Sequence, residues 1–230
     1  MLTDYFGPMF AEKTHTLRAA GVKELVAKRH VLAYKHVKDK ARYGENLMTH
    51  DGFSFPGKTV ENAVQIYEHM RKEVKRNKIR NLSRLVILID EVQFFTPDII
   101  DFCAEFKPYM GIYTAHLDRD FLARPFKFEK SEKTVGHLMA LADRRIALTA
   151  VCNYTKRESL DPCSEPASFT QRVDKHGMPI LTGKTVEVGG DEKYAPRCIK
   201  CYVPHQGDHA IFSPEDLLFA SEEKRENKRR

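Results

Sequence analysis

The segment Leu85–Phe95 reads LVILIDEVQFF and decides the fold class. Its first five residues, LVILI, form an unbroken apolar run, which is typical of a strand buried on both faces in a parallel sheet. Asp90 and Glu91 follow at once, where phosphate-loop proteins place their second acidic motif. Asp90 would hold magnesium, directly or through water, and Glu91 could accept a hydroxyl proton. The alternative is a pair of solvated carboxylates at a strand end.

The segment Gly7–Thr14, GPMFAEKT, lies between a predicted strand over 2–6 and a predicted helix over 13–28. It is similar to the phosphate loop G-x-x-x-x-G-K-[ST], whose backbone N–H groups and helix N-terminus hold phosphate oxygens. Gly7, Lys13 and Thr14 fit this pattern, with the lysine on the phosphates and the hydroxyl on magnesium. Glu12 stands where the pattern has glycine, so it adds bulk and negative charge unless it turns to solvent. A chance turn before a lysine is the alternative.

Strands and helices alternate through the first two thirds of the chain, which predicts an α/β fold with a parallel sheet. Residues 39–58 are rich in Gly, Asp, Lys and Pro and are expected to form a loop. Pro97 is expected to open a helix, with Thr96 as its cap. The other expected strands are 30–35, 85–89, 109–115 and 145–151, and the other expected helices are 60–77, 97–106 and 134–143.

The character of the sequence changes after residue 150, where short β-like pieces alternate with turn residues. We therefore expect a nucleotide-binding α/β domain over 1–150, a small second domain over 151–205, and a C-terminal segment with a charged tail over 206–230. A unit of about 55 residues is small enough to need a staple. A metal bound by cysteines would supply one.

Five cysteines are present, and four of them lie in the last third of the chain. Cys103 sits in an apolar stretch with helical spacing and is expected in the core. Cys198 and Cys201 form a C-x-x-C pair with the usual zinc spacing, and Cys152 and Cys163 form a wider pair. Because no secretion signal is evident, metal binding is favoured over disulfides. Four unrelated free thiols are the alternative.

The composition is that of an ordinary globular chain. Among 230 residues, 42% are hydrophobic and 30% are charged, and the formal net charge is +6. No apolar run approaches the roughly 18 residues of a membrane span, so no membrane association is expected. The N-terminus lacks the features of a secretory signal, which makes the cytoplasm the default compartment without excluding an organelle. The modest cationic excess favours anionic partners such as nucleotides, or a surface with no specific partner.

Five blocks of this sequence together resemble the zinc-containing, tetrameric (type II) thymidine kinases. The resemblance covers about residues 1–205, and the last block is its most specific part. The blocks are GPMFAEKT, IDEVQFF, LDRDFLARPF, CSEPASFTQR and EVGGDEKYAPRCIKCY. The resemblance implies a phosphate-loop kinase domain with a small zinc-ribbon-like lasso domain that closes over the nucleoside. It also implies transfer of the ATP γ-phosphoryl group to the 5′-hydroxyl of thymidine in deoxynucleoside salvage, by a homotetramer with ATP, Mg²⁺ and structural Zn²⁺.

The resemblance also assigns roles to matching positions. Glu91 would be the general base on the 5′-hydroxyl. ATP and magnesium would be bound by Gly7, Lys13, Thr14 and Asp90. Backbone hydrogen bonds to the base would come from residues Val186–Gly190. The thymine and deoxyribose pocket would be lined by Met9, Leu117, Phe121, Phe126, Val188 and Tyr194. Structural zinc would be bound by Cys152, Cys163, Cys198 and Cys201.

Several positions depart from the family pattern. Glu12 replaces glycine, and the segment Asp39–Tyr43 (DKARY) is one residue longer than usual, which affects Asp39 and Arg42 as expected contacts. Asp4 stands in the first strand where an apolar residue is expected, and His116 stands where a small residue is usual. About eight residues are inserted between the first two cysteines.

These departures leave two alternatives to a working kinase. One is a catalytically degenerate relative that serves as a structural subunit of a larger assembly, with its basic tail on RNA or protein. The other is a zinc module that binds nucleic acid directly, although the chain lacks the dense Lys/Arg and aromatic interleaving of such surfaces.

Overall fold

The computed structural model describes residues 1–39, 47–48, 54–155, 161–185 and 192–205. A six-stranded sheet forms its centre, with the strand order β5-β2-β6-β7-β1-β8 and every neighbouring pair parallel. The predicted α/β fold with a parallel sheet is therefore confirmed. The strands of this sheet are β1 (Leu2–Phe6), β2 (His30–His36), β5 (Lys58–Val60), β6 (Leu85–Asp90), β7 (Gly111–His116) and β8 (Arg144–Ala147).

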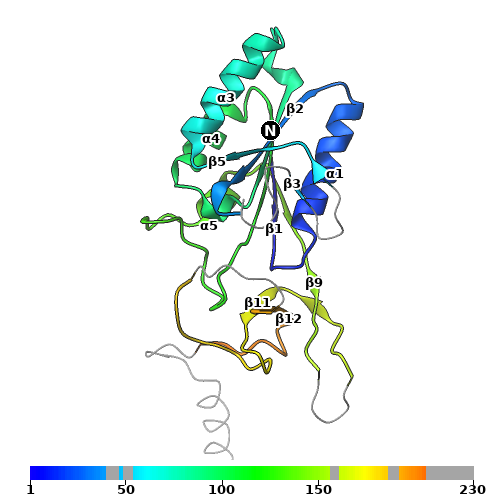
Figure 1. Cartoon of the computed structure of the whole chain (residues 1–230), viewed down its shortest axis with the longest axis vertical. Coiled ribbons are helices and arrows are strands. Elements are labelled where there is room, and N and C mark those ends of the chain that lie inside the picture. The colour runs from blue at the N-terminus through cyan, green and yellow to red at the C-terminus, as the bar shows by residue number, and fades with distance from the viewer. Residues whose placement is uncertain (40–46, 49–53, 156–160, 186–191, 206–230) are drawn as a thin grey trace, which may run out of the picture.

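Helices cover both faces of this sheet, as Figure 1 shows. The four helices of the described chain are α1 (Lys13–Val26), α3 (Ala63–Arg76), α4 (Asp98–Phe106) and α5 (Val135–Leu141). Helix α1 lies on one face, and the other three lie on the opposite face.

The strand β6 shows why its sequence is apolar throughout. Leu85, Ile87 and Ile89 point into the larger core beneath α3, α4 and α5, whereas Val86 and Leu88 point into the smaller core beneath α1. All five side chains are completely buried. Successive strand residues face opposite sides, so a strand covered on both faces must be apolar at every position.

Side-chain caps explain the starts of two of the four described helices. Asn62 caps α3 by accepting a hydrogen bond from the backbone N–H of Gln65 at 3.0 Å. Thr134 and His137 form a reciprocal capping box at the start of α5. The expected cap at Thr96 is wrong, because Pro97 occupies the N-cap of α4.

The structure corrects three further element boundaries. The single strand expected over 145–151 is two strands, β8 in the central sheet and β9 (Ala150–Val151) in a separate small sheet. The segment expected as a loop, 39–58, contains the short paired strands β3 (Leu47–Met48) and β4 (Ser54–Phe55). Val60 belongs to β5 rather than to the helix that follows it.

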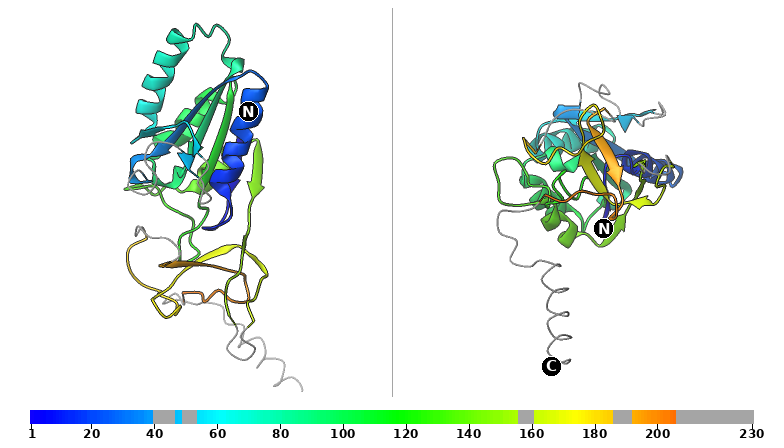
Figure 2. Two further views of the ribbon diagram at one scale, coloured as in Figure 1. Left: turned by 45° about the vertical axis from the view of Figure 1, so that its right-hand side comes forward. Right: turned by 90° about the horizontal axis from the view of Figure 1, so that it is seen from below.

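The residues after β8 form two small antiparallel sheets. Strand β9 pairs with β10 (Pro166–Ala167), and β11 (Phe169–Arg172) pairs with β12 (Tyr194–Arg197). Figures 1 and 2 place both beyond the carboxyl ends of the central strands, where the parallel strands present their loops. Ligands of open parallel sheets bind at this edge.

None of the helices in the described part of the chain combines the length and apolar character needed to cross a lipid bilayer.

Candidate functional site

The loop between β1 and α1 approaches the neighbouring backbone closely at Gly7. This glycine has a φ of 151°, and a Cβ atom built on it would lie 2.2 Å from the carbonyl oxygen of Leu148. A side chain at this position would therefore strain the backbone and collide with the segment after β8. Gly7 allows the loop to pass beneath that segment and enter α1.

Glu12 adopts the backbone conformation that explains why phosphate loops use glycine at this position. It is the N-cap of α1 with a φ of 56°, in the left-handed region. Its side chain is 70% exposed, and its Oε2 atom lies 3.7 Å from Nδ1 of His15. The carboxylate therefore turns to solvent instead of into the loop.

The Lys13 side chain bonds back to the loop that precedes it. Its Nζ atom donates a hydrogen bond to the carbonyl oxygen of Pro8 at 2.6 Å, and the side chain is buried. Burial lowers the pKa of Lys13, and the carboxylates of Glu91, Asp90 and Asp118 partly oppose that effect. The ammonium group thus lies in the field of the three acids that surround the end of the sheet.

The strongest sign of a cation site is the contact between Thr14 and Asp90. The Thr14 hydroxyl donates to Oδ2 of Asp90 at 2.8 Å, across 76 residues of sequence. Thr14 begins the first turn of α1, and Asp90 ends β6. A hydroxyl and a carboxylate are hard oxygen ligands that suit Mg²⁺, and their position beside the loop fits a metal that also contacts phosphate.

Glu91 is held by a side chain to which the sequence motifs assign no role. Nε2 of Gln93 donates to Oε2 of Glu91 at 2.5 Å, while Oε1 of Gln93 accepts from the backbone N–H of Leu117 at 3.2 Å. Gln93 is 2% exposed. The signal that could have identified it is its position inside IDEVQFF, two residues after the candidate base.

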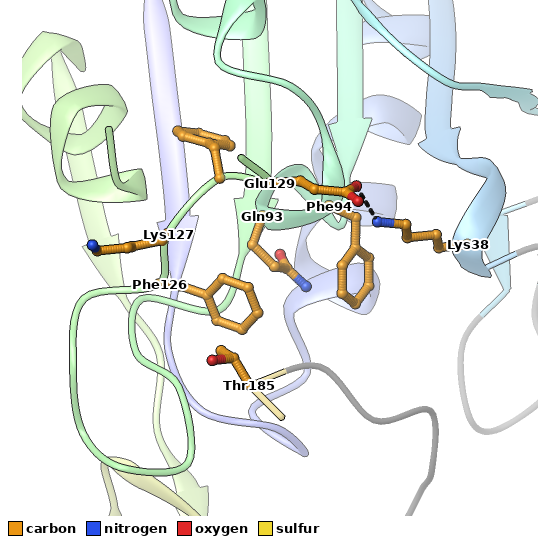
Figure 3. A pocket seen from close by; sticks show the side chains of 8 residues that line it. Lys38, Gln93, Phe94, Phe126, Lys127, Glu129 and Thr185 are labelled. Atoms are coloured by element: carbon orange, nitrogen blue, oxygen red, sulfur yellow. Dashed lines mark hydrogen bonds and ion pairs between the residues drawn. The ribbon is translucent and has the colours of Figure 1, made fainter. Parts of the chain in front are cut away.

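A cavity of about 280 Å³ opens beside Gln93 (Figure 3). The Phe94 and Phe126 rings meet edge to face in its lining, with centroids 6.4 Å apart. At its rim, Nζ of Lys38 lies 2.5 Å from a carboxylate oxygen of Glu129. The cavity is lined by Lys38, Gln93, Phe94, Phe126, Lys127, Phe128, Glu129 and Thr185. An aromatic lining suits a flat ring.

Of the residues predicted to line the nucleoside pocket, Phe126 alone lines this cavity in the described structure. Leu117 adjoins it through Gln93, as described above. Phe121 is buried with the guanidinium of Arg172 5.5 Å from its ring centre, and Tyr194 is buried on β12. The predicted contacts Val188 and Val186–Gly190, together with Arg42 and the tail over 206–230, lie outside the described residues.

The small sheets also support the loop Gly7–Thr14. The backbone N–H of Met9 donates to the hydroxyl of Thr170 on β11 at 2.9 Å. Phe10 and Ala11 pack in one apolar cluster with Cys152 and Cys198. The conformation of the loop therefore depends on residues beyond the central sheet.

The four cysteines predicted to bind zinc lie together. The Sγ atoms of Cys152, Cys163, Cys198 and Cys201 all lie within 4.8 Å of one another. The sulfurs of Cys163 and Cys198 are 3.7 Å apart, close to the roughly 3.8 Å that tetrahedral Zn–S bonds of about 2.3 Å require. The donor set and its spacing both fit zinc.

Hydrogen bonds at this cluster favour a thiolate. Burial by itself raises the pKa of Cys198. Hydrogen bonds from the Cys201 thiol, from the backbone N–H groups of Lys200 and Cys201 and from Cys163 outweigh that effect and lower the pKa to about 7. Thiolates are the form that binds metal. Cys103 lies apart in the core, as predicted.

Comparison with known proteins agrees with this geometry. The family model for thymidine kinase matches residues 1–202. This chain belongs to the thymidine kinase family. A thymidine kinase from Pyrobaculum aerophilum is 30% identical over 207 residues, covering 88% of this chain and 98% of the relative. The predicted family is confirmed, and the match extends over both the central sheet and the four-cysteine cluster.

Proposed function

We propose that this chain is a thymidine kinase that transfers the γ-phosphoryl group of ATP to the 5′-hydroxyl of thymidine. The observation that carries this proposal is the convergence of Thr14, Asp90 and Glu91 at one end of the sheet, beside an aromatic cavity. Family membership supports thymidine phosphorylation.

The loop Gly7–Thr14 and the N-terminus of α1 would bind the phosphates of ATP through backbone N–H groups. Lys13 would leave the carbonyl of Pro8 and place its ammonium on the phosphates. Thr14 and Asp90 would hold Mg²⁺, which neutralises charge on the transferring group when bound. The main contribution of these residues is position and electrostatics, because phosphoryl transfer requires little covalent chemistry from the protein.

Glu91 would act as the general base that accepts the proton of the 5′-hydroxyl. Gln93 would orient the Glu91 carboxylate, since its amide binds one oxygen of that group. Phe126 and Phe94 would contact the pyrimidine in the cavity, with Met9, Leu117, Phe121, Val188 and Tyr194 completing the pocket as the second unit closes. Exclusion of water from this pocket would protect ATP from hydrolysis.

We further propose that the four cysteines bind one structural zinc, that the protein assembles as a homotetramer, and that it acts in deoxynucleoside salvage in the cytoplasm. The zinc site has the most direct support, because the four sulfur atoms lie close together. Neither the family match nor the described contacts support a catalytically degenerate structural subunit or a nucleic-acid-binding module.

The direct test is thymidine-dependent formation of ADP by the purified, zinc-loaded protein with Mg²⁺. Glu91→Ala should reduce kcat by at least about 100-fold, because general-base catalysis contributes roughly 10²–10⁴-fold. Glu105→Gln is the matched control, since Glu105 is exposed on α4. Absence of phosphorylated thymidine at high concentrations of folded protein would overturn the proposal.

A further inference from the structure

Two ionisable residues from neighbouring strands of the central sheet form a buried contact. Asp4 on β1 and His116 on β7 are both 0% exposed, and Nε2 of His116 lies 3.0 Å from a carboxylate oxygen of Asp4. The Thr114 hydroxyl donates to the same carboxylate at 2.6 Å. Asp4 and His116 are two of the positions that depart from the family pattern, and in the structure they contact each other.

The geometry specifies the protonation state of the ring. Nε2 of His116 faces the Asp4 carboxylate, and Nδ1 lies 3.0 Å from the carbonyl oxygen of Leu117. The Leu117 carbonyl and an ionised Asp4 carboxylate only accept hydrogen bonds, and a neutral imidazole has one N–H donor. The doubly protonated ring is therefore the form that satisfies both contacts.

The surrounding charges agree with that assignment. Burial lowers the pKa of His116, but the charge and hydrogen bond of Asp4, the Leu117 carbonyl and the charge of Asp118 together raise it above its ordinary value. On the α4 side the titratable neighbour is Cys103, whose pKa is raised by burial and by Asp4, so it is a neutral thiol. On the β1 side the Phe6 ring stacks near the imidazole and adds no charge.

The backbone of Leu117 connects this pair to the candidate base. Its carbonyl faces His116, and its N–H donates to Gln93, which in turn binds Glu91. The contacts between Asp4 and the Glu91 carboxylate are thus hydrogen bonds joined through the backbone of Leu117. Asp4 and His116 are buried against the sheet and do not line the described cavity.

We propose that His116, held by Asp4, is a positioning residue that fixes the backbone of Leu117 and, through Gln93, the carboxylate of Glu91. The inference rests on the proposed kinase function. It also predicts a pH dependence. The imidazolium is the form that holds Leu117, so positioning is complete at low pH and is lost as pH rises through the raised pKa of His116.

The protonation state can be tested without any activity. In the full-length wild-type protein with ¹⁵N-labelled histidine, the Nδ1 and Nε2 resonances of His116 are assigned by comparison with His116→Ala. We expect both nitrogens to carry a proton at neutral pH. A neutral ring with one protonated nitrogen would overturn the inference.

The positioning role is tested by the pH profile of kcat for thymidine phosphorylation in the wild type and in Asp4→Val/His116→Ala. The double substitution removes both charges together, so it should fold even where either single substitution leaves a buried charge unpaired. At neutral pH we expect kcat to fall about 10- to 100-fold, as misplacement of a catalytic group can cause. The alkaline loss of kcat due to His116 should be absent from the variant.

His30→Ala is the matched control, because His30 is exposed at the start of β2. It should keep the wild-type profile. A double variant that keeps the wild-type kcat and alkaline limb would show that the pair only stabilises the sheet, and would overturn the positioning role. Wild-type protein that is folded but does not phosphorylate thymidine would instead contradict the proposed function, and the NMR measurement would still test the charged pair.

Discussion

The loop Gly7–Thr14 and the four-cysteine cluster differ in how the sequence forms them, although they contact each other through Phe10 and Ala11. The loop is one continuous segment whose shape follows from Gly7 and the start of α1. The cysteine cluster joins distant pairs, with Cys163 and Cys198 separated by 35 residues. A short segment can thus specify a binding loop, whereas a metal cluster needs the surrounding strands to bring its ligands together. The contact between them implies that loss of the cluster should also disturb the loop.

Among the proposed variants, Cys198→Ser should have the largest effect on both the cysteine cluster and the loop. The wild type should contain about one zinc per chain, and the variant should lose most of it because one thiolate ligand is missing. Without the metal the second unit should lose order, since metal binding and folding are coupled in small units. Because Phe10 and Ala11 pack on this cluster, ATP affinity should also fall, by about tenfold or more. Metal analysis and ATP titration measure the two effects.

Cys103→Ala is the control for this experiment. Cys103 is also buried, but it lies on the core face of α4, away from the other four cysteines. Its substitution should leave the zinc content unchanged. Full zinc content in Cys198→Ser would refute the four-cysteine site, and unchanged ATP affinity in a zinc-free variant would show that the loop is independent of the cluster.

A smaller effect is expected from Glu12→Gly. The exposed carboxylate of Glu12 is turned to solvent, where its charge is screened. We therefore expect the KM for ATP to change by less than about threefold. Because glycine accepts a φ of 56° without strain, the variant should be more stable by up to about 1 kcal/mol.

Glu12→Gln separates the two effects, because it removes the charge and keeps the side chain in the strained conformation. Thermal unfolding and ATP kinetics of both variants give the comparison. ATP binding that becomes ten or more times tighter in Glu12→Gly and in Glu12→Gln alike would mean that the carboxylate repels phosphate in the complex.

Much of the fold was predictable because its signals are local. The apolar run of β6 predicts a strand covered on both faces, and its five apolar side chains are fully buried. The element boundaries that were predicted wrongly depend on tertiary contacts. The stretch 145–151 is continuously strand-like, but its ends belong to different sheets, and nothing local marks the change.

The site was predictable where a motif carried the chemistry. The motifs GPMFAEKT and IDEVQFF assign Thr14 and Asp90 to one magnesium ion, and the structure places the two side chains 2.8 Å apart. Their binding of the metal stays a prediction. Gln93 and the Asp4–His116 pair were not identified as partners, because each contact crosses between strands or loops. Read singly, Asp4 and His116 are departures from a pattern, and only the parallel register of β1 and β7 brings them together.

Binding of ATP and Mg²⁺ at the loop Gly7–Thr14 is tested most directly by calorimetric titration of ATP into the zinc-loaded protein. The titration is done with and without Mg²⁺ and repeated with Thr14→Ala and Asp90→Asn. We expect the wild type to bind ATP, to bind it more tightly with Mg²⁺, and to lose that gain in both variants, because the metal is held by those two oxygens. Absence of ATP binding by folded wild-type protein at millimolar concentrations, with or without Mg²⁺, would contradict the account.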